Sequence, residues 1–209
     1  MDEKEVRTEI AEIKEEPKEL APAPSAPTLI NWFDSKAVGN VYKVAQLLST
    51  SGLLPERYKG KPADVMIAMD LASRMNLSLV NVCQDLYVVQ GNPGWSGKFC
   101  ISAINNCGRY TPLEFVWFDE ATGGCLAQAR DLRTGKLCQS APITNQTVKD
   151  FGWDAKANSM WNKAGMRQQM FMYRAAAYFA RTFCPDVLSG MYTTEEIHDI
   201  KQSYTVVEG

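Results

Sequence analysis

The spacing of apolar and polar positions predicts a long helix at residues 164–184. This stretch has no Pro, has little Gly and is rich in Ala, Met, Gln and Arg, which favours about five helical turns before Pro185 ends the helix. At 100° per residue it has one apolar side and an opposite side of cations that fall within roughly 40°. The apolar side holds Met172, Tyr173, Ala176, Phe179, Ala180 and Phe183, and the cations are Lys163, Arg167, Arg174 and Arg181. We expect the apolar side to be buried and the cations to be exposed.

Shorter helical patterns precede and follow this helix. Pro62 is typical of a helix start, Ser35 of an N-cap, and Thr193 or Thr194 can cap the last helix. The expected helices span 35–52, 62–76, 99–108, 144–154 and 193–202, with a loop at 155–165.

The region between them favours strands. Aromatic and alternating residues separated by Gly-containing turns predict a three-stranded antiparallel meander over 113–120, 124–132 and 136–144. A further β-rich run at 85–90 leads into the Gly-Asn-Pro-Gly turn at 91–94. We therefore expect an α+β fold, in which an antiparallel β-sheet packs against the long central helix, with additional helices, in a single domain.

Composition divides the chain into a tail and a core. The first 20 residues are rich in Glu and Lys and precede a Pro/Ala linker, so we expect an acidic disordered tail at 1–28, a core at 29–203 and a short tail at 204–209. No apolar run approaches the roughly 18 residues of a membrane span, and the N-terminus lacks a signal-peptide pattern. We expect a soluble cytoplasmic protein with no membrane partner.

The net charge of −2 hides an uneven distribution. Residues 1–20 hold eight acids and four bases, whereas residues 36–181 hold 17 bases and 10 acids. A basic body with a cationic helix face suits a polyanion backbone, although a merely solvated face is the alternative.

Several kinds of chemistry are disfavoured. The six cysteines form no CxxC pair, which indicates reduced and mostly buried thiols, and His198 is the only histidine. The sequence GNPGWSGK has a faint likeness to a phosphate-binding loop, but five residues separate Gly91 from Gly97 instead of four, and Phe99 replaces the expected Ser or Thr. We expect no metal, no cofactor and no bond-making chemistry.

Two blocks of the chain resemble the RecT family of phage single-strand annealing proteins. They are residues 52–110, from GLLPERYKGK to NNCGRY, and residues 161–197, from WNKAGMRQQM to MYTTEEI, and the similarity covers about 36–200. The second block is also similar to the helix of the related Redβ recombinase, where a basic helix is followed by a Gly-hydrophobic-Tyr element such as Gly190-Met191-Tyr192.

The resemblance implies a DNA recombination protein of a bacterial host cell. Such a protein binds single-stranded DNA and anneals complementary strands without ATP, holding the new duplex in homo-oligomeric rings or helical filaments. A partner exonuclease and a host single-strand binding protein are further implied partners. Family members often continue into a C-terminal segment associated with host partners, whereas this sequence stops nine residues past Ile200. A general single-strand coating protein and a two-metal nuclease are the alternatives, although the acids form no recognisable metal motif.

The resemblance also indicates DNA-binding residues. It places Lys163, Arg167 and Arg174 in the stretch of phosphate contacts, while Arg181 either contacts phosphate or braces the core through an ion pair. Lys98 and Trp95 are candidates for a phosphate contact and a base-stacking surface, with core packing as the alternative for Trp95. Arg109 is a further candidate, for which a solvated surface is the alternative.

Overall fold

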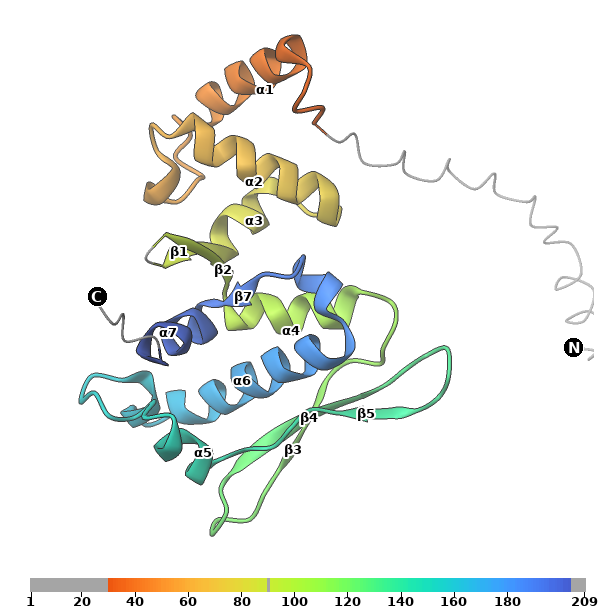
Figure 1. The fold of residues 1–209 in the computed structure, drawn as a ribbon, viewed down its shortest axis with the longest axis vertical. Coiled ribbons are helices and arrows are strands. Elements are labelled where there is room, and N and C mark those ends of the chain that lie inside the picture. The colour runs from red at the N-terminus through yellow and green to blue at the C-terminus, as the bar shows by residue number, and fades with distance from the viewer. Residues whose placement is uncertain (1–29, 90, 204–209) are drawn as a thin grey trace, which may run out of the picture.

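Helices and antiparallel strands alternate along the chain in the expected α+β architecture, seen in a computed structural model that describes residues 30–89 and 91–203 (Figure 1). Helices α1 and α2 lie at one end of the long axis, and the larger sheet lies at the other end beneath the central helix α6. The predicted tails at 1–28 and 204–209 lie outside the described residues.

The first two helices form an arm. Helix α1 (Ser35–Leu48) packs on α2 (Pro62–Met75), and the 3₁₀ turn η1 (Glu56–Tyr58) connects them. Asp34 caps α1 in place of the predicted Ser35, because its carboxylate accepts from the backbone N–H groups of Lys36 and Ala37 at 2.9 and 3.2 Å. Helix α2 begins at Pro62 and stops before Asn76, whose φ of 52° is left-handed, as its sequence pattern predicts.

A small mixed sheet connects the arm to the rest of the domain. Helix α3 (Leu79–Asp85) leads into an antiparallel hairpin of β1 (Leu86–Val89) and β2 (Asn92–Trp95), and β7 (Tyr192–Thr193) pairs with β2 in parallel. The sequence pattern predicts the β-rich run and the turn but neither α3 nor the pairing with β7. That pairing ties the C-terminal part of the chain to the hairpin.

The glycines of GNPGWSGK allow close packing. Helix α4 (Gly97–Asn106) is capped by the Ser96 hydroxyl, and a Cβ at Gly97 would overlap the ring of Tyr173 on α6. A Cβ at Gly94 would meet the Tyr192 carbonyl at 3.1 Å and the side chain of Ile197. Both glycines are therefore explained by contacts within the fold.

The larger sheet contains the predicted antiparallel meander. Its strands β3 (Glu114–Trp117), β4 (Gly124–Arg130) and β5 (Leu137–Gln139) are adjacent in that order, and β6 (Ile143–Thr144) also pairs with β4. Strand β4 turns its small side chains, Cys125, Ala127 and Ala129, into the core. The sheet thereby lies close against α6, which covers one of its faces (Figure 1).

Helix α6 (Met166–Phe183) is the centre of the domain. It follows α5 (Asn145–Asp150) and the turn η2 (Met160–Asn162), and it precedes η3 (Pro185–Leu188) and α7 (Thr194–Ser203). The sequence predicts its position, and its expected apolar side is buried or partly buried. The opposite side is buried as well, since it includes Met170, Phe171, Arg174, Ala175 and Ala177. The expectation of one solvent-exposed side was therefore wrong for much of the helix.

Within residues 30–89 and 91–203, no helix is both long enough and apolar enough to cross a membrane.

Candidate nucleic-acid interface

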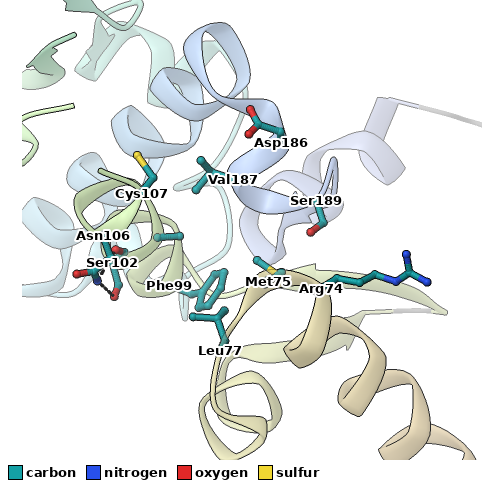
Figure 2. Close-up of a pocket in the computed structure, with 11 residues that line it drawn as sticks. Arg74, Met75, Leu77, Phe99, Ser102, Asn106, Cys107, Asp186, Val187 and Ser189 are labelled. Carbon is teal, nitrogen blue, oxygen red and sulfur yellow. Dashed lines mark hydrogen bonds between the residues drawn. The ribbon is translucent and has the colours of Figure 1, made fainter. Parts of the chain in front are cut away.

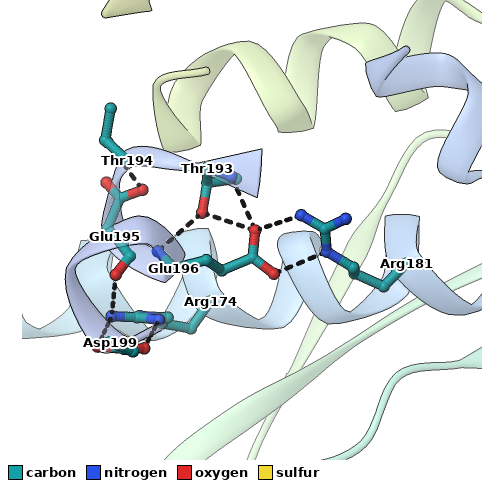
Figure 3. A network of polar contacts seen from close by, with 7 residues as sticks. All are labelled: Arg174, Arg181, Thr193, Thr194, Glu195, Glu196 and Asp199. Carbon is teal, nitrogen blue, oxygen red and sulfur yellow. Dashed lines mark hydrogen bonds and ion pairs between the residues drawn. The ribbon is translucent and has the colours of Figure 1, made fainter. Parts of the chain in front are cut away.

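Arg174 lies in the interior, although the helical pattern predicts it on an exposed row. The residue is 3% exposed, and its guanidinium lies 4.0 Å from the ring centroid of Trp153. Both terminal nitrogens bind the Asp199 carboxylate of α7, and one also donates to the Glu195 carbonyl at 3.0 Å. Arg174 therefore holds α7 against α6 (Figure 3).

Arg181, seven residues after Arg174, makes a second ion pair between α6 and α7. Its Nε and one terminal nitrogen each donate to the Glu196 carboxylate at 2.9 Å, and the guanidinium lies 4.0 Å from the Tyr192 ring centroid. Glu196 also accepts from the Thr193 backbone N–H at 2.8 Å, completing a capping box at the start of α7 (Figure 3). Of the two alternatives for Arg181, the structure contains the ion pair.

The pKa of Glu196 reflects opposing influences. Burial raises the pKa of this carboxyl, but hydrogen bonds from Arg181 and from the Thr193 backbone outweigh burial, and the net pKa lies below its usual value. The ionised carboxylate is therefore a stable part of the fold at neutral pH.

The four cations of the predicted row do not form one open face. Helix α7 covers the second half of the row, because its carboxylates neutralise Arg174 and Arg181. Helical periodicity places cations on one side of a helix but does not reveal which later segment returns to cover them. The available signal was the spacing of Glu196 and Asp199, which puts two acids on one side of the last helix.

The first half of the row remains accessible. Lys163 is exposed and precedes α6. Arg167 is partly buried, where it donates to the Trp161 carbonyl at 2.8 Å and to the Asn145 side-chain oxygen at 3.1 Å. Arg167 thus fastens the segment before α6 and the start of α5 to the helix, while the Lys163 ammonium has no ion-pair partner among the described residues.

Trp95 belongs to the core. It is fully buried, its ring stacks on Phe99 with centroids 4.1 Å apart, and its indole N–H donates to the Leu188 carbonyl at 3.1 Å. The core-packing alternative is therefore the one observed, and Trp95 presents no surface on which a base could stack.

Lys98 and Arg109 lie at the surface in ion pairs. The Lys98 ammonium is 2.8 Å from the Asp85 carboxylate, and a guanidinium nitrogen of Arg109 is 3.0 Å from Asp186. The cation side chains remain 59% and 44% exposed. Exposed pairs of this kind are worth only about 0–1 kcal/mol, so a phosphate can compete with the carboxylate for either cation.

The segments that lead into α6 carry three exposed lysines, two of which lie outside the predicted row. Lys149 on α5 and Lys156 in the following segment are exposed, as Lys163 is. None of the ion pairs between described residues includes these three lysines. We call Lys149, Lys156, Lys163 and Arg167 the α5–α6 basic surface, and its elements lie together at one end of α6 (Figure 1).

A cluster of stacked aromatic rings supports this surface. Trp153 stacks on Phe151 and Trp161 with centroids 5.3 and 5.2 Å apart, and Trp161 meets Phe171 of α6 edge-on at 5.0 Å. These contacts fix the segment between α5 and α6 to the core, so the lysines that it carries are held on an ordered support.

A separate cavity of about 270 Å³ lies where the end of α2 meets α4 and η3. Met75, Leu77 and Phe99 lie together at its apolar side, with Val187 nearby (Figure 2). The cavity includes none of the DNA-binding residues predicted from the sequence. It lies at the junction between the arm and the rest of the domain.

The acids of the described residues do not converge. Among them, no group of three or more His, Cys, Asp or Glu side chains is placed to hold a metal ion. The nuclease alternative therefore gains no support from the geometry.

Comparisons of the chain with models of protein families, with curated proteins and with solved structures found no match.

Proposed function

We propose that this protein binds single-stranded DNA and anneals complementary strands without ATP, as an assembly of several copies. The proposal joins the resemblance of residues 52–110 and 161–197 to the RecT family with the charge distribution around α6. The partner exonuclease, the host single-strand binding protein and the bacterial cytoplasm remain expectations drawn from that resemblance.

The observation that carries the proposal is the α5–α6 basic surface. Residues 145–185 contain six bases and only two acids, and the three lysines among those bases are exposed without a carboxylate partner among the described residues. Unpaired cations on an ordered support attract a polyanion, because binding releases the counterions condensed on its phosphates. The surface suits a phosphate backbone and leaves the bases free for pairing.

The annealing step requires that contacts go mainly to phosphates. One copy offers only a few cations, which is too few for firm binding at physiological salt. Neighbouring copies acting along the same strand would add their contacts at high effective concentration. Assembly on DNA is therefore part of the proposed function.

The test of this surface is the salt dependence of binding. If four cations of each copy meet phosphates, the logarithm of affinity should fall with the logarithm of salt concentration at a slope of about −3 for single strands. A fluorescence titration of a labelled oligonucleotide at several salt concentrations measures this slope. A slope near zero would contradict electrostatic binding by the α5–α6 basic surface.

A further inference from the structure

A cleft lies beside the α5–α6 basic surface, between α7 and the segment that precedes α6. We call residues 152–165 the flap, because Gly152 and Gly165 bound it with φ values of +63° and +79°. The cleft has a volume of about 580 Å³. The flap residues Trp153 and Lys156 line it, together with Arg174 of α6 and Glu195 and Asp199 of α7.

Two buried N–H donors of the cleft have no partner among the described residues. They are the indole Nε1 of Trp153 and the Nε of Arg174. The two residues are only 8% and 3% exposed, yet both line the cleft. Buried donors are nearly always satisfied in native proteins, because an unpaired buried N–H keeps the full cost of its lost hydration. Two such donors beside one cleft indicate a ligand that brings hydrogen-bond acceptors.

The rings of the cleft do not offer an open face for stacking. Trp153 already contacts Phe151, Trp161 and the Arg174 guanidinium, and Trp161 meets Phe171 edge-on. The group of Trp153 that has no partner among the described residues is its indole N–H. A planar ligand would therefore be held by hydrogen bonds to the polar groups on its rim and not by stacking on a ring face.

The charges of the cleft argue against a phosphate as this ligand. The lining holds two permanent cations, Lys156 and Arg174, and two carboxylates, Glu195 and Asp199, with His198 beside them. A phosphate entering the cleft would meet the two carboxylates. A neutral group with both acceptors and donors suits this lining better. Its carbonyl oxygens would accept from Trp153 and Arg174, and its amino or imino groups would donate to the carboxylates.

We infer that the cleft under the flap holds one nucleobase of the bound strand, turned out of the stack and bound by its edge. The inference rests on the proposed function and deepens it, because the backbone of the same strand would cross the adjacent α5–α6 basic surface. One base at each copy would be withheld from pairing, and the bases between the copies would stay free to pair. Splayed bases bound by their edges are a common mode of single-strand recognition. The volume of the cleft is within the range of small-ligand sites.

The base would enter by rotation at the two ends of the flap, against the ring contacts of Trp153 and Trp161 that hold the flap in the described conformation. Both unpaired donors are shielded in the described conformation, so the cleft has to widen before a base can reach them. Gly152 and Gly165 sit at the two ends of the flap in left-handed conformations, and glycine absorbs backbone rotation at little cost. The Lys156 side chain, which has no ion pair among the described residues, can then move together with the flap.

The test is a double-mutant cycle between the Trp153 donor and the bases of the strand. Trp153→Phe removes the N–H and keeps an aromatic ring. The probes are a thymidine oligonucleotide and an abasic oligonucleotide of the same length and charge. We expect Trp153→Phe to weaken binding of the thymidine strand by about 2- to 10-fold, the worth of one hydrogen bond, and to leave binding of the abasic strand unchanged.

Trp32→Phe is the matched control. Its indole N–H already has a partner, the Asp70 carboxylate at 3.4 Å, and it lies on the arm. This variant should bind both strands as the wild-type protein does. Equal weakening of both strands by Trp153→Phe, or no weakening of either, would overturn the inference.

Two further measurements on the wild-type protein do not depend on the folding of a variant. Thymidine should displace the thymidine strand at a concentration where inorganic phosphate at matched ionic strength does not. Displacement by phosphate alone would overturn the base assignment. If neither oligonucleotide binds at all, the proposed function fails. In that case, quenching of tryptophan fluorescence by thymidine in the wild type but not in Trp153→Phe would still support base binding in the cleft. No quenching in the wild type would refute both the proposed function and the cleft inference.

Discussion

The arginines of α6 differ in how many of their N–H donors the fold already uses. Arg174 and Arg181 each bind a carboxylate and a backbone carbonyl, whereas Arg167 binds a carbonyl and an amide oxygen without a carboxylate. A carboxylate in a buried pair cannot be displaced cheaply, because it leaves an uncompensated charge behind. Position in the row therefore separates Arg174 and Arg181, whose charges are paired with carboxylates of α7, from Arg167, whose charge is not paired with a carboxylate of the described residues.

This difference predicts opposite effects for two substitutions. Arg174→Ala should lower the free energy of unfolding by about 3–5 kcal/mol, because it leaves Asp199 without its partner. Lys163→Ala should change stability by less than about 0.5 kcal/mol, since the residue is exposed, but it should weaken single-strand binding. Denaturant unfolding and a DNA titration of both variants measure these effects. A stable Arg174→Ala variant with reduced DNA binding would restore the exposed-row interpretation.

At the scale of elements, local sequence patterns predicted where helices and strands lie but did not predict which distant segments contact one another. The position of α6 and the meander of β3, β4 and β5 follow from periodicity, turns and Pro185, all of which act within a few residues. The covering of α6 by α7, the parallel pairing of β7 and the burial of Trp95 depend on segments far apart in the chain. The position of α6 was therefore predicted correctly, whereas the exposure of Arg174 on it was predicted incorrectly.

The docking of α7 should depend on pH through Glu196. Its pKa is lowered in the fold, so the stabilising ion pair with Arg181 is fully present above the ordinary pKa of 4.5 and is lost as pH falls through the lowered value. Glu196→Gln should cost about 1.5–3 kcal/mol at pH 7, the worth of a hydrogen bond to a charged group.

The difference in unfolding free energy between the wild type and Glu196→Gln should become smaller at acidic pH. Below about pH 4.5 the Glu196 carboxylate of the unfolded chain becomes protonated, and the folded carboxylate follows at its lowered pKa, so the stability difference between the wild type and Glu196→Gln should shrink as the pH falls. Denaturant unfolding of both proteins across pH 3–7, about the titration range of a glutamate, measures the difference. A difference that stays constant over this range would show that the carboxylate charge does not hold α7.

At the scale of the whole molecule, charge is distributed unevenly along the chain. The acidic residues 1–20 precede a domain whose exposed lysines, in our proposal, attract a polyanion. Removal of residues 1–27 should leave thermal unfolding of the domain unchanged and leave DNA binding equal or tighter, as measured by calorimetry and titration at low salt. A truncated protein that no longer assembles or anneals would show that this segment serves assembly.

The ability to bring complementary strands together is the central claim, and it distinguishes an annealing protein from a coating protein. The most direct measurement adds two strands in sequence, without ATP, and follows assembly by gel shift and electron microscopy. In parallel, the second strand is replaced by a non-complementary strand of equal length. We expect a much more stable assembly with the complementary strand than with one strand alone, and no added stability with the non-complementary strand. Equal stabilisation by both second strands would contradict annealing and leave generic coating of DNA.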